Sequence, residues 1–245
     1  MADTFGISSP LDKRGATIQA MFAGVAPRYD LLNHVLSASL DRLWRRRAAQ
    51  ALAAAPGARV LDLCCGTGDQ ALALARRGGQ VVAGDFCIPM LALAEPKYER
   101  FAKRAGGPRP RGLAADALGL PFPTSFFEGA TVAFGLRNVA DLGLALAELH
   151  RVLRPLAPLV VLEFAVPTRQ PLRGLYLFYF RRLLPAIGRW LSPRGSAYSY
   201  LPNSVLEFPQ RQGLLEQMAS AGFTDLDSRD LAAGAVCLYR CRRAQ

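Results

Sequence analysis

The sequence predicts a doubly wound α/β domain, built on a mostly parallel sheet with helices on both faces. From residue 59 onward, short apolar runs alternate with amphipathic segments of 9 to 17 residues. Segments of that length join parallel strands as crossover helices. The first apolar run ends in a glycine turn that leads into a helical segment, and the last two runs are close enough to pair antiparallel.

The predicted elements follow in a simple order. Helical periodicity at 18–25 and 40–52 indicates that helices precede the sheet. Strand-like runs occupy 59–63, 80–84, 113–115, 129–134, 159–164, 223–229 and 236–240. Helices are expected at 69–77, 89–105, 141–153 and 210–221, and the glycine- and proline-rich stretch 106–112 is expected to form an exposed loop.

The length of 245 residues suits one domain. We expect an N-terminal helical cap at 1–56, a ligand-binding core at 57–165, an inserted lid at 166–209, where the alternation stops, and completion of the sheet by 210–245.

Composition excludes several classes of protein. A hydrophobic share of 51% and a charged share of 20% exclude a disordered chain. The most apolar candidate for a membrane span, 172–191, is interrupted by four arginines. The five cysteines are odd in number and form no CxxC pair, so we expect a reducing cytoplasm, no disulfide framework and no metal site.

The positive charge is concentrated in two segments. Residues 11–50 carry seven basic and three acidic side chains, and residues 167–210 carry six and one, which together supply +9 of the net +11. Arginines alternate there with bulky apolar residues, as in 43–47 and 175–182. That mixture favours an anionic membrane surface over nucleic acid, although a buried aromatic core with a solvated arginine face gives the same pattern.

The run 60–69, Val-Leu-Asp-Leu-Cys-Cys-Gly-Thr-Gly-Asp, has the pattern of a nucleotide-binding turn. Gly66 and Gly68 allow a sharp turn and a close approach to a ligand. Asp85 ends the next strand, where a carboxylate accepts ribose hydroxyls, and Asp116 follows the third strand, in reach of an adenine amino group.

Two carboxylates argue against a dinucleotide. Asp62 lies inside the first strand, and Asp69 stands at the helix N-terminus where a pyrophosphate would bind. A ligand with a nucleoside, a cation and no phosphate fits better, and S-adenosylmethionine has these properties. Each aspartate also has a structural interpretation, as a helix cap or a turn residue.

With these residues the sequence resembles the class I S-adenosylmethionine-dependent methyltransferases, which have a Rossmann-like fold. Within that class it resembles the C-methyltransferases of menaquinone and ubiquinone biosynthesis. The resemblance covers nearly the whole chain and rests on 26–33, 62–69, 85–91, 115–117, 162–164, 197–202 and, most specifically, 133–139, Ala-Phe-Gly-Leu-Arg-Asn-Val. The chain departs from it at Ala133, where some members have serine, and at 155–158, where Pro-Gly-Gly is common.

The resemblance implies S-adenosylmethionine as methyl donor and a polyprenyl hydroquinone as acceptor. It places the cofactor at Asp62, Gly66, Thr67, Gly68, Asp85, Phe86, Met90, Asp116 and Ala117. The implied reaction is methylation of a ring carbon of demethylmenaquinol to menaquinol. The alternatives are C-methylation of the 2-polyprenyl-6-methoxy-benzoquinol precursor of ubiquinone and, more remotely, RNA methylation.

Arg137 and Asn138 are the candidate catalytic residues, because they follow the fourth strand at the same edge of the sheet as the glycine turn. Arg137 would stabilise a developing phenolate and Asn138 would orient a water molecule or a ring oxygen; a structural pair that binds loop carbonyls is the alternative. Tyr29, His34 and Tyr200 are the candidate substrate contacts. We expect an enzyme peripheral at the inner face of the cell membrane, without a nucleic-acid partner, as a homodimer or in a quinone-pathway complex.

Overall fold

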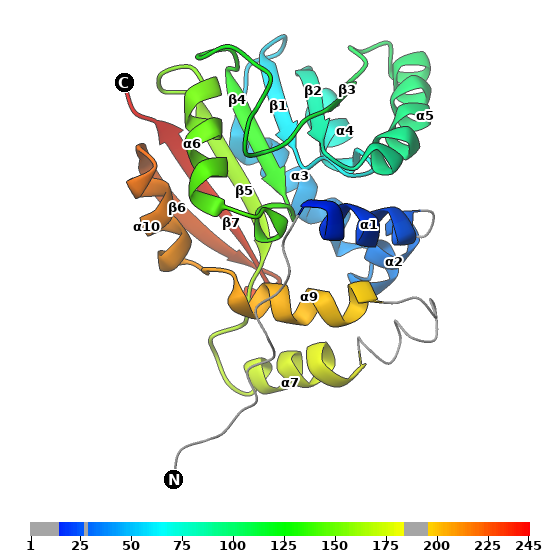
Figure 1. Cartoon of the computed structure of the whole chain (residues 1–245), viewed down its shortest axis with the longest axis vertical. Helices are drawn as coiled ribbons and strands as arrows, with labels where there is room; N and C mark the ends of the chain where they lie inside the picture. The colour runs from blue at the N-terminus through cyan, green and yellow to red at the C-terminus, as the bar shows by residue number, and fades with distance from the viewer. Residues whose placement is uncertain (1–14, 27–28, 184–195) are drawn as a thin grey trace.

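A computed structural model describes residues 15–26, 29–183 and 196–245. Its seven strands form one sheet in the order β3-β2-β1-β4-β5-β7-β6 (Figure 1). The strands are β1 Arg59–Leu63, β2 Gln80–Asp85, β3 Arg111–Ala114, β4 Gly129–Ala133, β5 Pro158–Phe164, β6 Phe223–Leu231 and β7 Val236–Arg243.

Strands β1 to β5 are parallel, and the C-terminal strands run antiparallel to their neighbours. β1 pairs with β2 on one side and β4 on the other, so the chain reverses its direction across the sheet at β1. β7 pairs antiparallel with both β5 and β6. The predicted fold class, including the antiparallel C-terminal pair, is therefore confirmed.

The helices fall into three groups. α1 Gly15–Val25, α2 Tyr29–Leu36 and α3 Leu40–Leu52 precede the sheet. α4 Asp69–Ala75, α5 Ile88–Ala105, α6 Leu142–Val152 and α10 Gln212–Ser220 accompany its strands. α7 Leu172–Phe178, the π-helical turn η3 Tyr179–Leu183 and α9 Ser196–Glu207 lie between β5 and α10.

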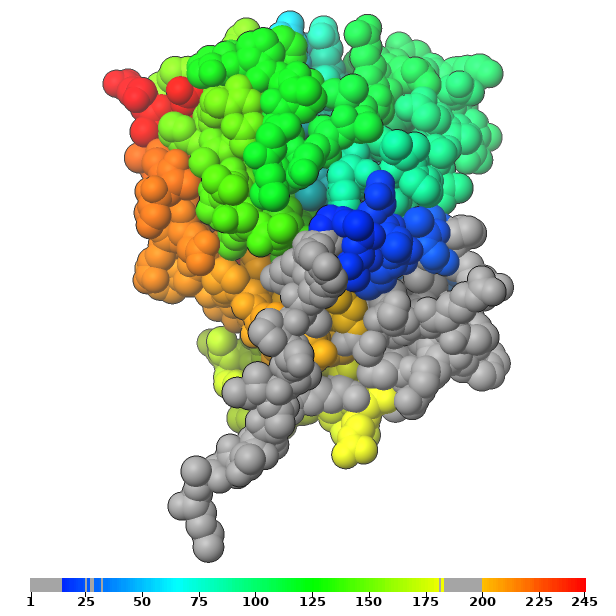
Figure 2. Space-filling view, in the orientation of Figure 1, coloured from blue at the N-terminus to red at the C-terminus, as the bar shows by residue number. Residues whose placement is uncertain are grey.

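Two apolar cores lie on the two faces of the sheet, as expected for parallel strands. One contains Leu146 of α6 and Met218 of α10, and the other contains Leu52 of α3 and Tyr98 of α5. Figure 1 shows α1, α2, α7 and α9 gathered at one end of the molecule, below the sheet. In the space-filling view the blue N-terminal helices lie against the surface formed by the central part of the chain (Figure 2).

One local expectation was wrong. The stretch 106–112 was expected to be a loop, but its last two residues begin β3. All four residues of this edge strand are exposed, so no apolar alternation marks its start.

Within the described ranges, no helix has the length and apolar character that crossing a membrane requires.

Candidate active site

The loop after β1 turns sharply because three of its residues adopt positive φ angles. These are Cys64 at 56°, Gly66 at 55° and Gly68 at 84°. A Cβ on Gly68 would overlap the phenol ring of Tyr98 from α5. Glycine at this position thus allows close packing on a helix, whereas the sequence had suggested close approach to a ligand.

Asp85 anchors the same loop at the end of β2. Its Oδ2 accepts a hydrogen bond from the Gly66 N–H at 2.7 Å, and its Oδ1 accepts one from the Cys87 N–H at 2.8 Å. Burial raises the pKa of the Asp85 carboxyl, and these backbone donors oppose that effect. Each oxygen keeps a second lone pair for a ligand hydroxyl.

A cavity of about 140 Å³ lies over this loop and the carboxyl ends of β1, β2 and β4; we call it the cofactor cavity. Most of the predicted cofactor residues line it, namely Gly66, Thr67, Asp85, Phe86, Met90, Asp116 and Ala117. Tyr29 and Asn138 also line it. The side-chain oxygen Oδ1 of Asn138 is buried without a hydrogen-bond partner, so it is free to accept a bond from a ligand.

Asp62 does not line this cavity, contrary to the expected direct contact. Its side chain is completely buried behind the loop, where Oδ1 accepts a hydrogen bond from Thr131 Oγ1 at 2.9 Å and Oδ2 has no partner. Burial raises the pKa of Asp62 to about 7, against the smaller lowering effects of Thr131 and Arg45. Gly68 also lies outside the lining.

A second cavity, of about 350 Å³, adjoins the first; we call it the acceptor cavity. Phe22, Tyr29, Arg45 and Phe134 line both cavities and so form their common wall. The remaining lining is mostly aromatic and aliphatic and comes mainly from α2, α3, α7, η3 and α9. A ligand in one cavity would therefore lie close to a ligand in the other, next to these shared residues.

Four polar side chains of the acceptor cavity have buried atoms without hydrogen-bond partners. These atoms are the hydroxyls of Tyr176 and Tyr200 and the Nε atoms of Arg45 and Arg137. Burial raises the pKa of Tyr200 to about 12 and raises that of Tyr176 as well, so both phenols are protonated hydrogen-bond donors at neutral pH. Tyr29 and Tyr200 were predicted substrate residues; Tyr176 was not, because the sequence shows it only as one aromatic residue among many.

Arg137 and Asn138 lie in the 3-10 turn η2 Leu136–Asn138 but face different cavities. Arg137 Nη1 donates to Glu163 Oε1 at 2.7 Å and also to the Phe134 carbonyl oxygen. Asn138 lines the cofactor cavity and Arg137 the acceptor cavity. The predicted pair therefore spans the boundary between the two.

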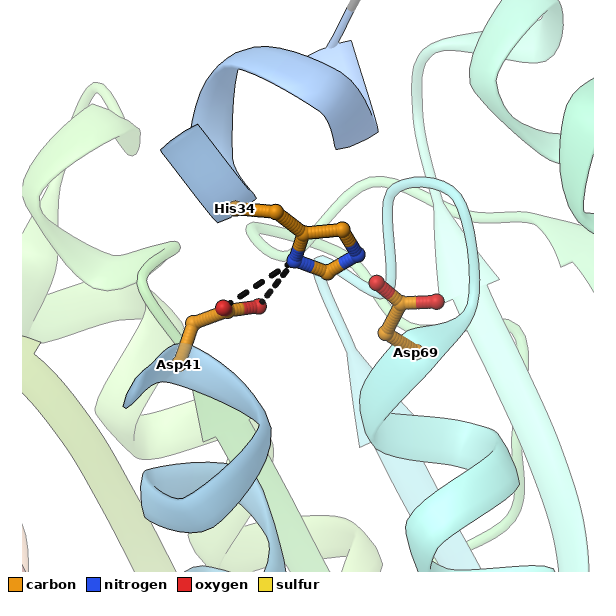
Figure 3. A group of neighbouring side chains, drawn as sticks. All are labelled: His34, Asp41 and Asp69. Atoms are coloured by element: carbon orange, nitrogen blue, oxygen red, sulfur yellow. Dashed lines mark hydrogen bonds and ion pairs between the residues drawn. The ribbon is translucent and has the colours of Figure 1, made fainter. Parts of the chain in front are cut away.

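His34 lines neither cavity, so the expected substrate contact is not seen. Its Nδ1 lies 2.9 Å from Asp41 Oδ2, and its ring stands between Asp41 of α3 and Asp69 of α4 (Figure 3). Their potential ligand atoms lie within 4.8 Å of one another, a spacing that suits a metal ion. Lys97 Nζ already lies 2.9 Å from Asp69 Oδ1, which disfavours a cation there.

Lys97 and Thr67 fasten the N-terminal helices to the cofactor loop. Lys97 Nζ forms ion pairs with Asp69 and with Asp30 of α2, and the hydroxyl of Thr67 donates to Asp30. Burial tends to raise the pKa of Asp69, but the neighbouring Lys97 and Arg45 outweigh it and lower that pKa. Asp69 is thus a charged structural anchor, and a phosphate at this helix N-terminus would meet its negative charge.

One expected surface element is partly buried. Of the basic and apolar residues at 43–47, Leu43, Arg46 and Arg47 are exposed, but Trp44 and Arg45 are buried. Asp41, Arg45 and Ala49 are spaced by four, which places them on the buried face of α3. That spacing is the signal by which the sequence marks Arg45 as an inward-facing residue.

Comparison with known proteins identifies similar methyltransferases. The model of the ubiE/COQ5 methyltransferase family matches residues 11–243. A demethylmenaquinone methyltransferase of Thermus thermophilus is 51% identical over 207 residues, which are 83% of this chain and 91% of that protein. A ubiquinone/menaquinone biosynthesis C-methyltransferase UbiE of Geobacter sulfurreducens is 42% identical over 94% of this chain and 89% of its own length.

Solved structures agree on the fold. The [4+2]-cyclase SpnF superposes with a TM-score of 0.70 at 19% identity, over 96% of this chain and 98% of that one. A SAM-dependent methyltransferase of Thermotoga maritima gives 0.64 at 16% identity, over 92% and 99%. The extent of the family match and the identity to its curated members show that the chain belongs to the ubiE/COQ5 methyltransferase family.

Proposed function

We propose that the protein transfers a methyl group from S-adenosylmethionine to a ring carbon of demethylmenaquinol, giving menaquinol. The observation that carries this proposal is the pair of adjoining cavities. One has carboxylate groups at successive strand ends, the other is aromatic with a few unpartnered polar atoms, and four residues separate them. The name of the Thermus thermophilus relative supports this choice of acceptor.

The residues of the cofactor cavity fit S-adenosylmethionine. Asp85 has lone pairs free for ribose hydroxyls, and Asp116, whose Oδ1 accepts the Leu118 N–H at 3.0 Å, has its other oxygen free for the adenine amino group. Ala117 leaves room beside it for the base, and Phe86 and Met90 provide apolar surface. When bound, the cofactor supplies a methyl group on a positively charged sulfur.

The acceptor cavity fits a hydroquinone with an apolar tail. Arg137 would stabilise the negative charge that grows on a ring oxygen, and Tyr176 and Tyr200 would donate to the ring oxygens. A ring carbon would then form a bond to the methyl carbon as the bond from that carbon to sulfur breaks, with its electron pair left on sulfur. The attacked ring carbon would finally give its proton to water, and the ring oxygen would regain a proton, which restores the aromatic hydroquinone.

A second acceptor is the 2-polyprenyl-6-methoxy-benzoquinol precursor of ubiquinone. The name of the Geobacter sulfurreducens relative, which mentions both quinones, favours it as the alternative. The two ring systems share the para-hydroxyl arrangement to which Arg137 and the tyrosines would bind. An RNA acceptor has less support, because the acceptor cavity is mostly apolar.

A polyprenyl tail implies that the enzyme meets its acceptor at a membrane, and we propose a peripheral position at the inner face. Helices α2, α3 and α7 line the acceptor cavity and also expose apolar side chains. The exposed residues are Leu31, Val35, Leu40, Leu43, Leu172, Leu175 and Phe178. In this proposal, residues 1–56 and the inserted lid 166–209 together form the membrane-facing part, and 57–165 with 210–245 form the cofactor-binding part.

Methyl transfer from labelled S-adenosylmethionine tests the proposal. Purified protein is incubated with chemically reduced demethylmenaquinol or with reduced methoxy-benzoquinol precursor, and the oxidised quinones serve as controls. Label in demethylmenaquinol alone supports the proposed acceptor. Label in the precursor alone would instead assign the protein to ubiquinone biosynthesis. Label in neither, with cofactor binding intact, would refute a quinol acceptor and would make RNA the next substrate to assay.

A further inference from the structure

Arg45 lies in the wall between the two cavities, where none of the described carboxylates is close enough to form an ion pair with it. Its side chain is buried, with 9% of the residue surface exposed, and it lines both cavities. Nε has no hydrogen-bond partner, and within the described part of the chain the guanidinium forms no ion pair. The guanidinium carbon lies 5.2 Å from the centre of the Phe134 ring, a cation–π contact that leaves its donors unused.

A buried arginine keeps its charge, so the burial of Arg45 without an ion-pair partner costs free energy until an anion binds next to it. Helix α3 holds the residue in place, because Trp44, Ala48 and Leu52 on its inner side belong to the apolar core beneath the sheet. The ring of Phe134 provides a further support. The guanidinium is therefore a fixed, unsatisfied cation at the edge of the cofactor cavity.

Among the described residues that line the cofactor cavity, Arg45 has the only cationic side chain. The other charged members, Asp69, Asp85 and Asp116, are carboxylates. These suit the ammonium, the ribose hydroxyls and the adenine amino group of S-adenosylmethionine, but none can receive its α-carboxylate. The positive charge of Arg45 already acts on the cofactor loop. It lowers the pKa of Asp69, and at Asp62 it partly offsets the increase in pKa that burial causes.

We propose that Arg45 binds the α-carboxylate of the methionine moiety of S-adenosylmethionine. This inference rests on the proposed function, because it assumes that cofactor. A phenolate of the acceptor is the competing anion. It is disfavoured because Arg137 already faces the acceptor cavity, and because the carboxylate is ionised at all neutral pH values whereas the hydroquinone is not.

Binding without an acceptor tests the inference directly. Isothermal titration calorimetry compares S-adenosylhomocysteine with S-adenosyl-3-thiopropylamine, the same thioether without its α-carboxylate. Hydrogen bonds to a charged group predict that the wild-type protein prefers the carboxylate ligand by about 10- to 100-fold. In Arg45→Met the affinity for S-adenosylhomocysteine should fall until the preference is less than about threefold, with the affinity for the thiopropylamine unchanged.

Two further variants complete the series. Arg45→Lys keeps the charge but loses the forked donor geometry, so it should retain part of the preference. Arg46→Met removes one exposed positive charge from the same helix and should bind both ligands as the wild type does. Thermal melting identifies any variant that fails to fold. If Arg45→Met fails to fold, the wild-type preference for the carboxylate ligand and its partial retention in Arg45→Lys decide the question.

The outcomes separate the two proposals. No wild-type preference for the carboxylate ligand, or an Arg45→Met variant that retains the preference or loses both ligands equally, overturns the role of Arg45 and leaves the cofactor in place. No binding of either ligand by the wild type refutes S-adenosylmethionine itself, and the inference falls with it. A normal preference in Arg45→Met combined with slower turnover would assign the guanidinium to the acceptor.

Discussion

Arg137 Nη1 lies 2.7 Å from Glu163 Oε1, and both side chains are almost completely buried. Glu163 also accepts the backbone N–H of Phe164 at 3.0 Å, so the carboxylate holds the arginine against the end of β5. The Nε of Arg137 remains without a partner beside the acceptor cavity. One arginine thus combines a structural ion pair with an unused donor.

Replacement of Arg137 should reduce both the rate of methyl transfer and the stability of the fold, and the two effects can be measured separately. Arg137→Ala should lower turnover at least 100-fold while cofactor binding persists, because the group that would stabilise the phenolate is lost. It should also destabilise the fold by about 3–5 kcal/mol, since Glu163 is left buried and unpaired. Single-turnover assays and chemical denaturation measure the two effects.

The double variant Arg137→Met with Glu163→Leu is the control for that result. Removing both charges should restore most of the stability, because replacing a buried ion pair by apolar residues is often neutral. Turnover should stay low. Recovery of turnover together with stability would mean that Arg137 acts through the fold alone and has no part in the chemistry.

The unpartnered hydroxyls of Tyr176 and Tyr200 give a second prediction. Replacing both by phenylalanine should raise the KM for the hydroquinone about tenfold or more and leave cofactor affinity unchanged, because only contacts to ring oxygens are lost. Stability should not fall, since neither hydroxyl has a partner to lose. Steady-state kinetics with varied hydroquinone provide the measurement.

Tyr98→Phe is a matched control for the tyrosine variants. Tyr98 also has a buried hydroxyl without a partner, but it lines neither cavity. Its replacement should leave the KM for the hydroquinone unchanged. An equal rise in KM for this variant would show that the effect comes from general repacking.

Asp62 should make stability depend on pH. Its folded pKa of about 7 lies above the ordinary 3.8, so between these values the folded state binds more protons than the unfolded chain. The free energy of unfolding should therefore fall as pH rises from about 4 to about 7, by up to about 4 kcal/mol, and then level off. Below pH 4 this carboxyl has no influence, because it is protonated in both states.

Asp62→Asn removes this titration while keeping an acceptor for the Thr131 hydroxyl. Denaturant unfolding of both proteins from pH 5 to pH 8 should show a stability difference that grows in favour of the variant as pH rises. A constant difference over that range would mean that Asp62 ionises at its ordinary pKa despite complete burial.

The sequence predicted the central strands β1, β2, β4 and β5 well because each is an apolar run bounded by turn residues. The strands β3 and β6 are mostly exposed, so their ends were predicted less exactly. The sequence failed at contacts between segments distant in the chain. His34 looked like a substrate residue because it lies in the N-terminal region, but the fold turns its ring toward Asp41 and Asp69 (Figure 3). Tyr176 gained significance only when its helix was placed beside the acceptor cavity.

The exposed apolar side of α7 supplies the final prediction. Leu172, Leu175 and Phe178 follow one another at intervals of three residues, and the last two are 66% and 56% exposed. Residues three apart lie close together on a helix surface, so they form a stripe that can enter a lipid interface. Leu175→Glu with Phe178→Glu should weaken binding to anionic vesicles at least tenfold in flotation or sedimentation assays.

A matched pair of substitutions distinguishes this stripe from general surface charge. Leu144 and Leu156 are 54% and 48% exposed, and Leu144 lies on α6, away from α7 (Figure 1). Leu144→Glu with Leu156→Glu adds the same negative charge and removes similar apolar area, so vesicle binding should change far less than with the α7 pair. Equal losses in both pairs would indicate that vesicles attract the protein only through its net charge of +11. Because α7 also lines the acceptor cavity, a specific loss should be accompanied by slower methylation of hydroquinone in vesicles, with unchanged methylation of a short-tailed hydroquinone in detergent-free solution.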